Sequence, residues 1–483
     1  MSATTMSLKP QTSNLSTAQA GYLRYLHSVL TRPLEDWSGF YTPRSQNANF
    51  AMRYQIAFAS YAMAALATIT PAYRRPYADA LRTAIERMID YATWRYWERT
   101  PGVPHEPTEG GYSPDPLAWG NVQYAGHLST MLGLYAKLTD DRRYAEQGFV
   151  LEGGGHHFSH THHDVATIIH QQMADNQCHG VSCEPGCVYL SCNNHSMSSN
   201  LLHDQLYDTN YAAVNGEWVA WLKQHMLAGM FPTLKHGLFN VVYMSEMKHA
   251  LPVSFNFTDG WGIGLLAPFA RELASDLYPR YRREVKRLKP NLAYVPSGPM
   301  TERMELSDRP LNTAFGYVAA RELGDPATAE AIHNYAVARL GLGERDGQLA
   351  CWEAARTLYV TALFALGSVD AVPGAGWSAI VLAPYRPDRF SEPSLDAVLL
   401  DGEVCGPLDA DVIAANYDDD SSTLHLTITP RRSGQLTLRL ANVTAIRAAQ
   451  VNDQPTELQS ADGCVSIGTL EAGVAVALAL LCQ

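Results

Sequence analysis

The sequence predicts a mainly α-helical protein, an (α/α)6 toroid over residues 17–370 followed by a small antiparallel β-sandwich over residues 375–483. Three observations predict this architecture. The chain has 483 residues, which exceeds what one hydrophobic core usually organises. Helical periodicity dominates up to residue 367. After residue 374, short apolar runs bounded by turn residues replace it, so two domains of different secondary structure are expected.

Segments with apolar residues at helical spacing fill the first domain. They are expected at residues 49–70, 73–97, 119–138, 163–176, 202–227, 261–278, 311–323, 326–340 and 351–366. So many helices joined by loops of uneven length favour a barrel of paired helices over a simple bundle. The sequence has no fixed-length repeat, which disfavours a solenoid. The Ser/Thr-rich residues 1–16 are expected to be disordered.

The second domain is predicted from short runs that are bounded by turn residues. The expected strands lie at residues 378–382, 397–400, 422–429 and 434–440. Residues 423–429 alternate polar and apolar side chains, as a half-buried strand does. This region carries no cluster of titratable groups, so a structural or interface role is expected for it.

Composition limits the classes of ligand. The net charge of −12 argues against a nucleic-acid partner, and no Lys/Arg run suggests a nucleic-acid groove. An aromatic content of 10% fits either a pocket for a hydrophobic small molecule or the cores of large helical domains. No apolar run approaches the roughly 20 residues that cross a bilayer. The first residues do not resemble a secretory signal, so a cytoplasmic protein with free thiols is expected.

Residues 156–203 are unusually rich in histidine and cysteine. The residues are His156, His157, His160, His162, His163, His170, His179, His195 and His203, with Cys178, Cys183, Cys187 and Cys192. A metal site, disulfides, buried packing and a pair of proton-transferring thiols are all open on composition. The cysteine spacings contain no short C-x2-C knuckle, which disfavours structural zinc. The histidines from 156 to 163 are expected to form a polar loop.

Three motifs in order resemble the linalool dehydratase/isomerase family over residues 30–370. The first is Gly180-Val181-Ser182-Cys183-Glu184-Pro185, followed by Cys192-Asn193-Asn194 nine residues after the first cysteine. The others are Asn121-Val122-Gln123-Tyr124-Ala125-Gly126-His127-Leu128 and Arg53-Tyr54-Gln55-Ile56-Ala57-Phe58. The element with two cysteines is the most specific of the three, and the other two add weight in combination.

The resemblance implies an (α,α)6 barrel that dehydrates or isomerises allylic terpene alcohols without a metal or an organic cofactor. It implies that Cys183 and Cys192 form the acid/base pair and that His127 and Tyr54 hydrogen-bond the substrate hydroxyl. Glu184 would either tune Cys183 or bond the backbone. This chemistry suits a dry barrel, because losing an allylic hydroxyl needs an acid, a base and the exclusion of water. The remaining candidates for substrate binding are Gln123, Tyr124, Tyr243 and Asn49.

The chain also departs from the family pattern. In the family a neighbouring subunit contributes an aspartate, a tyrosine and a cysteine, so the resemblance implies a homo-oligomer. The tyrosine falls on Tyr54, but the aspartate position falls on Ala48 and the cysteine position on Ala57. A family methionine is replaced by Gln123. The reaction thus stays open between dehydration, double-bond isomerisation and cyclisation of a terpenoid-like molecule or polyene.

Three other functions compete with the thiol mechanism. A carbohydrate-active barrel enzyme would need paired carboxylates, for which Asp36, Glu184, Asp259 and Glu353 are candidates. A noncatalytic protein would bind a hydrophobic ligand without turning it over. A metal-dependent hydrolase would carry stoichiometric zinc. The carbohydrate-active enzyme would tolerate Cys183→Ala and Cys192→Ala together, whereas the thiol mechanism would not.

Overall fold

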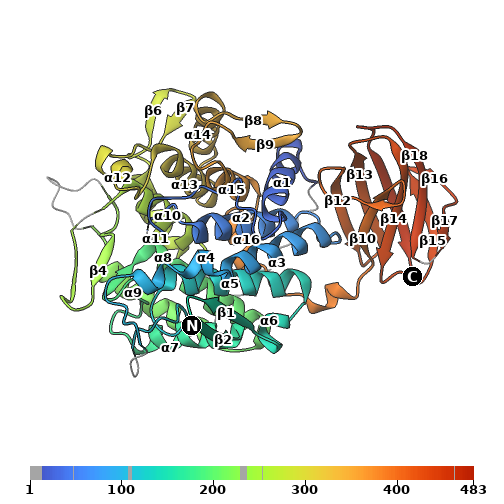
Figure 1. Ribbon diagram of the computed structural model, residues 1–483. Helices are drawn as coiled ribbons and strands as arrows, with labels where there is room; N and C mark the ends of the chain where they lie inside the picture. The colour runs from blue at the N-terminus through green and yellow to red at the C-terminus, as the bar shows by residue number, and fades with distance from the viewer. Residues whose placement is uncertain (1–13, 47, 107–110, 229–236, 253, 462) are drawn as a thin grey trace.

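The computed structural model describes residues 14–46, 48–106, 111–228, 237–252, 254–461 and 463–483 (Figure 1). Its architecture is helix-rich with a separate β-rich C-terminal region, as the sequence predicts. Most of the expected disordered segment 1–16 lies outside the described residues. At its end, Leu15 is buried and its N–H donates to the carbonyl of Ile413. Ser16 caps the first helix through the N–H of Gln19.

Within the described part of the chain, six helices pack side by side in a closed ring. They are α2 (Met52–Ala67), α5 (Val122–Thr139), α8 (Leu190–Tyr207), α10 (Asn256–Leu266), α13 (Arg309–Glu322) and α15 (Thr357–Ser368). Each contacts the next, and α15 contacts α2 to close the ring. Every residue of α2 is buried, which explains why this helix is Ala-rich and apolar on all sides.

A second set of helices packs outside the ring. It consists of α1 (Thr17–Leu30), α3 (Arg75–Ile89), α7 (His162–Asp175), α9 (Asn215–His225), α11 (Arg271–Tyr281) and α14 (Pro326–Arg339). Each contacts one or two ring helices, and the alternation of ring and outer helices follows the chain order. The short helices are α4 (Tyr91–Trp94), η1 (Trp97–Arg99), α6 (Arg143–Glu146), η2 (Tyr211–Val214), α12 (Pro299–Arg303) and η3 (Pro387–Phe390).

Several predicted helices are broken where a side chain captures backbone N–H groups. The single helix expected at 202–227 ends at Tyr207, because the Asp204 carboxylate accepts the N–H groups of Tyr211 and Ala212 and starts a new turn. The helix expected at 73–97 breaks at Asp90, whose side chain caps α4. Side chains that bond nearby backbone compete with helix continuation in this way.

Short antiparallel pairings occupy the connections. They are β1 (Phe149–Gly153) with β2 (His156–His160), β3 (Cys187–Tyr189) with β4 (Val242–Met244) and β5 (His249–Ala250), β6 (Lys286–Lys289) with β7 (Leu292–Tyr294), and β8 (Leu342–Arg345) with β9 (Gln348–Cys351). The prediction of a polar loop from His156 to His163 is therefore wrong. His156–His160 pairs with Phe149–Gly153, and Thr161 then caps α7.

The strand expected at residues 378–382 is also wrong, because this segment forms helix α16 (Gly376–Leu382). A short apolar run cannot be assigned to strand or helix from periodicity. Here a residue far away in the sequence, Glu322, stabilises the helix. The buried Glu322 carboxylate of α13 accepts the N–H groups of Trp377 and Ser378 at 2.9 and 3.2 Å, at the start of the helix.

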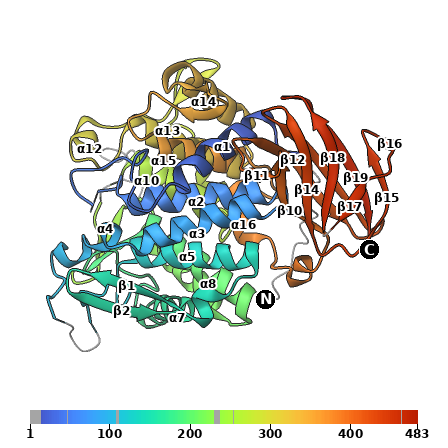
Figure 2. The same ribbon diagram turned by 45° about the vertical axis from the view of Figure 1, so that its right-hand side comes forward.

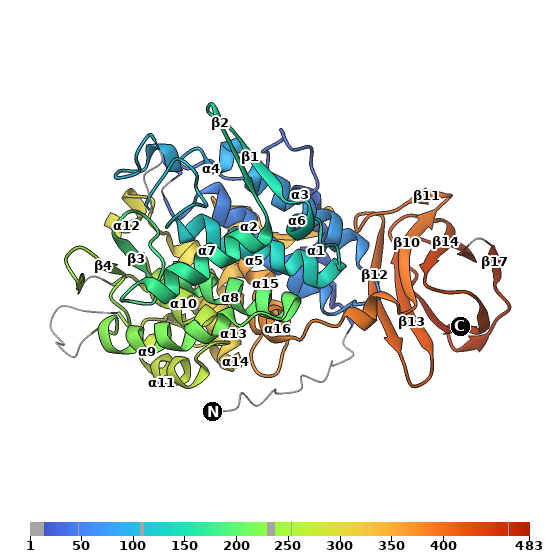
Figure 3. The ribbon, with the colours of Figure 1, turned by 90° about the horizontal axis from the view of Figure 1, so that it is seen from below.

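The described strands of the C-terminal region form two five-stranded antiparallel sheets. The strands are β10 (Ser394–Leu400), β11 (Glu403–Val404), β12 (Ala410–Asp418), β13 (Thr423–Pro430), β14 (Gly434–Ala441), β15 (Ile446–Val451), β16 (Gln454–Pro455), β17 (Gln459–Ala461), β18 (Cys464–Leu470) and β19 (Val476–Cys482). Their orders are β11-β10-β14-β18-β17 and β12-β13-β19-β15-β16. Apolar residues from both sheets share one core, and the region stands beside the helices (Figures 2 and 3).

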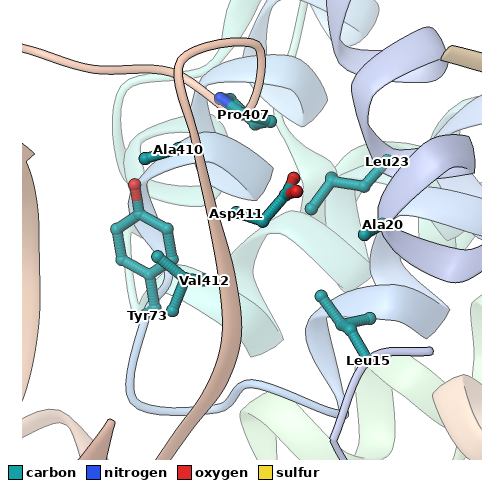
Figure 4. Close-up of a pocket in the computed structure, with 8 residues that line it drawn as sticks. All are labelled: Leu15, Ala20, Leu23, Tyr73, Pro407, Ala410, Asp411 and Val412. Carbon is teal, nitrogen blue, oxygen red and sulfur yellow. The ribbon is translucent and has the colours of Figure 1, made fainter. Parts of the chain in front are cut away.

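The two regions meet along a small, specific contact. The N–H of Leu395 donates to the carbonyl of Ala72, and the buried Arg24 pairs with Asp411 at 2.5 Å. A cavity of about 10 Å³ lies beside Asp411. Figure 4 shows residues that line it, among them Asp411, Tyr73 and Val412. That volume holds about one water molecule. The junction is therefore a packed interface rather than a ligand site.

Candidate active site

A tight turn presents the first thiol. Glu184, Pro185, Gly186 and Cys187 form a turn that closes when the N–H of Cys187 donates to the carbonyl of Glu184 at 2.9 Å. Gly186 has φ of +76°, and proline precedes it, as a type II turn requires. The N–H of Cys183 donates back to the carbonyl of Cys187 at 2.8 Å. This local geometry explains the Cys-Glu-Pro-Gly-Cys sequence.

The second thiol lies in the first turn of α8, and an asparagine fixes the two segments together. The Asn193 amide accepts the N–H of Val181 at 2.7 Å and donates to the carbonyls of Val181 and Tyr189. The asparagine that follows Cys192 in the motif is therefore a clamp. It holds the segment that carries Cys183 against the helix that carries Cys192.

The two thiols are buried and interact with each other. The exposed fraction is 0% for Cys183 and 6% for Cys192. Burial raises the pKa of the Cys183 thiol well above its usual value, and a hydrogen bond with Cys192 and the nearby Glu184 carboxylate raise it further. A thiol in this position stays protonated at neutral pH. Reactive thiols often have a pKa lowered toward neutral pH, but the pKa of Cys183 is raised instead.

Gln123 on α5 joins three groups beside the thiols. Its carbonyl oxygen accepts the Tyr54 hydroxyl at 2.8 Å and an Arg53 guanidinium N–H at 3.0 Å. Its amide nitrogen donates to Glu184 Oε1 at 3.2 Å, while Glu184 Oε2 is buried without a partner. Burial raises the pKa of Glu184, and the Arg53 cation opposes that rise.

Tyr54 connects this network to the thiols. Burial raises the pKa of its phenol well above the usual value; Arg53 lowers it, and Cys192, Cys183 and Glu184 raise it further. The Arg53 guanidinium lies 4.6 Å from the centre of the Tyr54 ring. The phenol is therefore a neutral donor within the electrostatic reach of both sulfurs.

A pair of closely packed histidines lies next to Tyr54. The rings of His127 and His195 are centred 3.8 Å apart, and the Tyr61 hydroxyl lies 2.8 Å from Nδ1 of His127 and 3.4 Å from Nδ1 of His195. Burial lowers the pKa of His127 well below its usual value, and it lowers that of His195 to about 3. Both imidazoles are neutral, and their Nε2 atoms are buried without a partner.

Aromatic rings wall this cluster on the remaining sides. Phe58 touches the rings of His127, Trp261 and Tyr359, and Trp261 stacks on Phe315 with centroids 5.0 Å apart. These five residues come from five ring helices: α2, α5, α10, α15 and α13. The assembled group of thiols, phenols, imidazoles and aromatic rings, which we call the thiol cluster, therefore lies inside the ring.

Six of the nine predicted site residues meet in this cluster: Cys183, Cys192, Tyr54, Glu184, Gln123 and His127. The His127 ring packs edge-on against the Tyr54 ring, with ring centres 5.3 Å apart.

The structure does not bring Tyr124, Tyr243 or Asn49 to the cluster. Successive helix residues point about 100° apart, so Tyr124 faces away from Gln123, and its hydroxyl donates to the carbonyl of Met88. Tyr243 on β4 packs against Trp221, with ring centres 4.7 Å apart. The Asn49 amide donates to the carbonyl of Leu306. These side chains have structural partners instead.

Sequence reasoning missed Tyr61, His195, Tyr359 and the clamp Asn193 as members of the site. Helical spacing carries part of the missing signal, because Tyr61 is two turns after Tyr54 and His195 is one turn after Cys192. The ring closure that brings Tyr359 on α15 against α2 depends on contacts far apart in the sequence.

Ala48 and Ala57, the positions of the family aspartate and second-subunit cysteine, are both buried. Tyr54 donates to Gln123 of its own chain, and Gln123 in turn donates to Glu184, the residue next to Cys183.

Other chemistries find less support. In the part of the chain that the structure describes, no group of three or more His, Cys, Asp or Glu side chains could hold a metal ion, and all eight cysteines are free. The candidate carboxylates are scattered. Asp36 accepts the N–H of Ser38, Glu353 is exposed, and Asp259 accepts the N–H groups of Leu238 and Phe239. None of the helices within the described ranges is long and apolar enough to span a membrane.

Comparison with known proteins supports one family. The sequence model of the linalool dehydratase/isomerase family matches residues 53–356. Among solved structures, the unsaturated glucuronyl hydrolase from Bacillus sp. GL1 matches with a TM-score of 0.46 and 13% identity, covering 77% of this chain and 98% of that one. The α-1,6-mannanase from Salegentibacter sp. HEL1_6 matches with a TM-score of 0.44 and 11% identity, covering 76% and 99%. Neither structural likeness assigns an activity to this chain.

Proposed function

Because the chain belongs to the linalool dehydratase/isomerase family, we propose that it is a cofactor-independent lyase or isomerase that uses Cys183 and Cys192 as its acid/base pair. The observation that carries this proposal is the contact between two buried thiols beside the Tyr54–Gln123–Glu184 network. The substrate class is a terpenoid-like alcohol or polyene, because aromatic rings wall the cluster.

The closed ring of six helices with helices outside it supports an (α/α)6 barrel as the catalytic domain, which we place at residues 17–370. The two sheets that share a core support a β-sandwich, which begins at β10 rather than at residue 375. Thiols transfer protons only when reduced, so a reducing compartment such as the cytoplasm suits this mechanism.

The mechanism follows from the protonated state of Cys183. Cys183 donates its proton to the oxygen of an allylic alcohol, and the C–O bond breaks with its electrons leaving on water. Cys192 passes its proton to the Cys183 thiolate through the contact between the two sulfurs. The Cys192 thiolate then removes a proton from the carbon next to the allylic cation. The C–H electrons form the new double bond, and both thiols are restored.

The other residues of the cluster position the oxygen and exclude water. Tyr54 and His127 hydrogen-bond the substrate hydroxyl. The Tyr61 hydroxyl bonds Nδ1 of His127 and so fixes the tautomer of His127, which decides whether Nε2 donates or accepts. A dry site prevents water from capturing the cation. If the water that leaves is kept in the site and adds at another carbon, the same residues catalyse isomerisation.

The test is incubation with a panel of allylic alcohols and polyenes in deuterated water. Wild-type protein is expected to place solvent deuterium at a substrate carbon when the elimination reverses. The Cys192 thiol exchanges the proton that it took from carbon with solvent, and it then returns a deuteron to the double bond. Cys183→Ala is expected to lose this incorporation by a factor of about 10²–10⁴, the usual contribution of a general acid or base.

The matched control is Cys178→Ala, which removes another buried thiol whose sulfur lies 3.7 Å from the carbonyl of Gly180. This variant is expected to retain wild-type incorporation. Equal incorporation by Cys183→Ala and wild type would contradict the thiol mechanism. Binding of the panel without turnover or exchange would favour a noncatalytic ligand-binding protein.

A further inference from the structure

Tyr359 on α15 carries a buried hydroxyl that no described protein group engages. Its side chain is fully buried, and the hydroxyl has no hydrogen-bond partner. The other phenols around the cluster are engaged: Tyr54 donates to Gln123, Tyr61 bonds His127, and Tyr96 donates to Asn121. An unpartnered buried hydroxyl is costly and calls for an explanation.

Two observations place this hydroxyl at the thiol cluster. Burial raises the pKa of Tyr359 well above its usual value, and the next largest contributions come from Cys192 and then Tyr61. The ring lies against Phe58 and Phe315, with centroids 5.3 and 6.1 Å away. Phe58 also packs against His127, so the Tyr359 ring lies among the aromatic walls of the thiol cluster. The hydroxyl stays protonated, because burial raises its pKa.

An oxygen-bearing ligand in the cluster would give this hydroxyl the hydrogen-bond partner that the described residues do not supply. We propose that the Tyr359 hydroxyl donates a hydrogen bond to the substrate oxygen from the Cys192 side of the cluster. Tyr359 is then a catalytic residue that supports the departing oxygen while Cys183 protonates it. This inference rests on the proposed function, because it requires an oxygen-bearing substrate at the thiols.

The test compares Tyr359→Phe with Tyr281→Phe in the full chain. Tyr281 is a matched control, because its hydroxyl is also buried and without a partner. It lies instead against Gly260 and Gly316, where an added Cβ would come within 2.6 and 3.1 Å of that hydroxyl. Both substitutions remove one oxygen atom from a fully buried phenol. Thermal unfolding of each variant checks that the fold is intact.

Two quantities are measured with the allylic alcohol that the wild type turns over. Tyr359→Phe is expected to lower kcat/KM by about 10- to 100-fold, the effect of losing a hydrogen bond to an oxygen that gains charge. It is also expected to weaken binding of that alcohol, measured by quenching of tryptophan fluorescence. Binding of the hydrocarbon with the same carbon skeleton is expected to be unchanged, because it has no oxygen for the phenol. Tyr281→Phe is expected to match the wild type in all three measurements.

The outcomes separate this inference from the proposed function. If wild type is active, Cys183→Ala is inactive and Tyr359→Phe matches Tyr281→Phe, the role of Tyr359 is overturned while the thiol mechanism stands. Equal weakening of alcohol and hydrocarbon binding would also overturn it, because that pattern indicates lost packing. If wild type turns over nothing in the panel, the proposed function and this inference both fail.

Discussion

At the residue scale, burial sets the protonation of four side chains in the thiol cluster. It keeps the Cys183 thiol and the Tyr54 phenol protonated and the His127 and His195 imidazoles neutral. Arg53 and Glu184 are the charged or chargeable side chains that meet at Gln123. The site therefore works with neutral acids in a dry environment, which suits the protonation of an alcohol that carries no charge of its own.

Glu184→Gln is expected to lower the pKa of Cys183. The Glu184 carboxylate raises that pKa through its negative charge, although burial and the Cys192 contact contribute more. The amide has nearly the same shape but no charge. The measurement is the ultraviolet absorbance of the thiolate as a function of pH, for wild type and for Glu184→Gln. The same titration is recorded for each protein with Cys183→Ala added, and the difference gives the titration of Cys183 alone. A Cys183 titration that moves to higher pH in Glu184→Gln would contradict this reading.

At the element scale, buried carboxyl groups organise segments that the sequence leaves ambiguous. Glu322 on α13 accepts N–H groups of Ala375, Trp377 and Ser378, and the Ser378 hydroxyl at 2.6 Å. Asp259 on α10 accepts the N–H groups of Leu238 and Phe239. Each carboxyl ties a loop or helix start to a ring helix, so both act on the fold around the site rather than on the substrate.

Glu322→Ala is expected to destabilise the helical region by about 2–4 kcal/mol, because it removes a helix cap and leaves several buried donors unsatisfied. Chemical denaturation followed by far-ultraviolet circular dichroism measures the loss. Glu322→Gln keeps one acceptor oxygen and is expected to lose less. A change below about 0.5 kcal/mol in the alanine variant, the size of an ordinary surface substitution, would show that α16 does not depend on this carboxylate.

Asp259 and Glu284 make stability depend on pH. Burial raises the pKa of Asp259 to about 7 and that of Glu284 to about 9, and the two carboxyls hydrogen-bond with Glu284 as the protonated partner. Folded-state pKa values above the unfolded ones mean that the folded state holds these protons longer. Their stabilisation is therefore complete below the unfolded values near 4 and is lost as pH rises through 7 and 9.

The variant Glu284→Gln is expected to flatten this dependence. Wild-type Tm should fall between pH 6 and pH 9, and the variant should fall less, because the amide has no proton to lose; each unit of pKa shift corresponds to about 1.4 kcal/mol. Glu272→Gln on the exposed face of α11 is the matched control and should follow the wild type. Parallel Tm curves for Glu284→Gln and wild type would rule out this pair as the source.

Helical periodicity was sufficient to predict most ring helices, and turn-bounded apolar runs were sufficient to predict three of the strands, because burial of one face leaves a pattern within each segment. These patterns were insufficient where a single side chain sets an element's end, as Glu322 does from a distant helix for α16 and Asp204 does locally for the end of α8. The thiols, Tyr54, Gln123 and Glu184 were predicted through a family motif. Tyr61, His195 and Tyr359 join them only through ring closure, which no local pattern encodes.

At the scale of the whole molecule, one chain supplies the complete thiol cluster. Tyr54 on α2 and the thiols at the start of α8 meet through Gln123 on α5, within the same ring. The family pattern would draw Tyr54 from a neighbouring subunit. In this chain Tyr54 bonds Gln123 within the closed ring, and the β-rich region contacts the helices through Arg24 and Ala72.

Subunit mixing tests this arrangement. Tyr54→Ala and Cys183→Ala are each expected to be nearly inactive, and mixing them after joint unfolding and refolding is expected to restore nothing. A site shared between copies would instead regain activity, because some interfaces would combine an intact Tyr54 with an intact Cys183. Recovery of about a quarter of wild-type activity or more would therefore contradict a site within one chain.

The most direct test of the thiol pair is a double-mutant cycle of kcat/KM over wild type, Cys183→Ala, Cys192→Ala and the double variant, with the alcohol that wild type turns over. Residues that act as a unit give strongly non-additive effects. Each single variant is expected to lose about 10²–10⁴-fold, and the double variant is expected to be about as slow as either single one. A double variant slowed by the product of two independent effects, or a Cys192→Ala variant as fast as wild type, would contradict the paired mechanism.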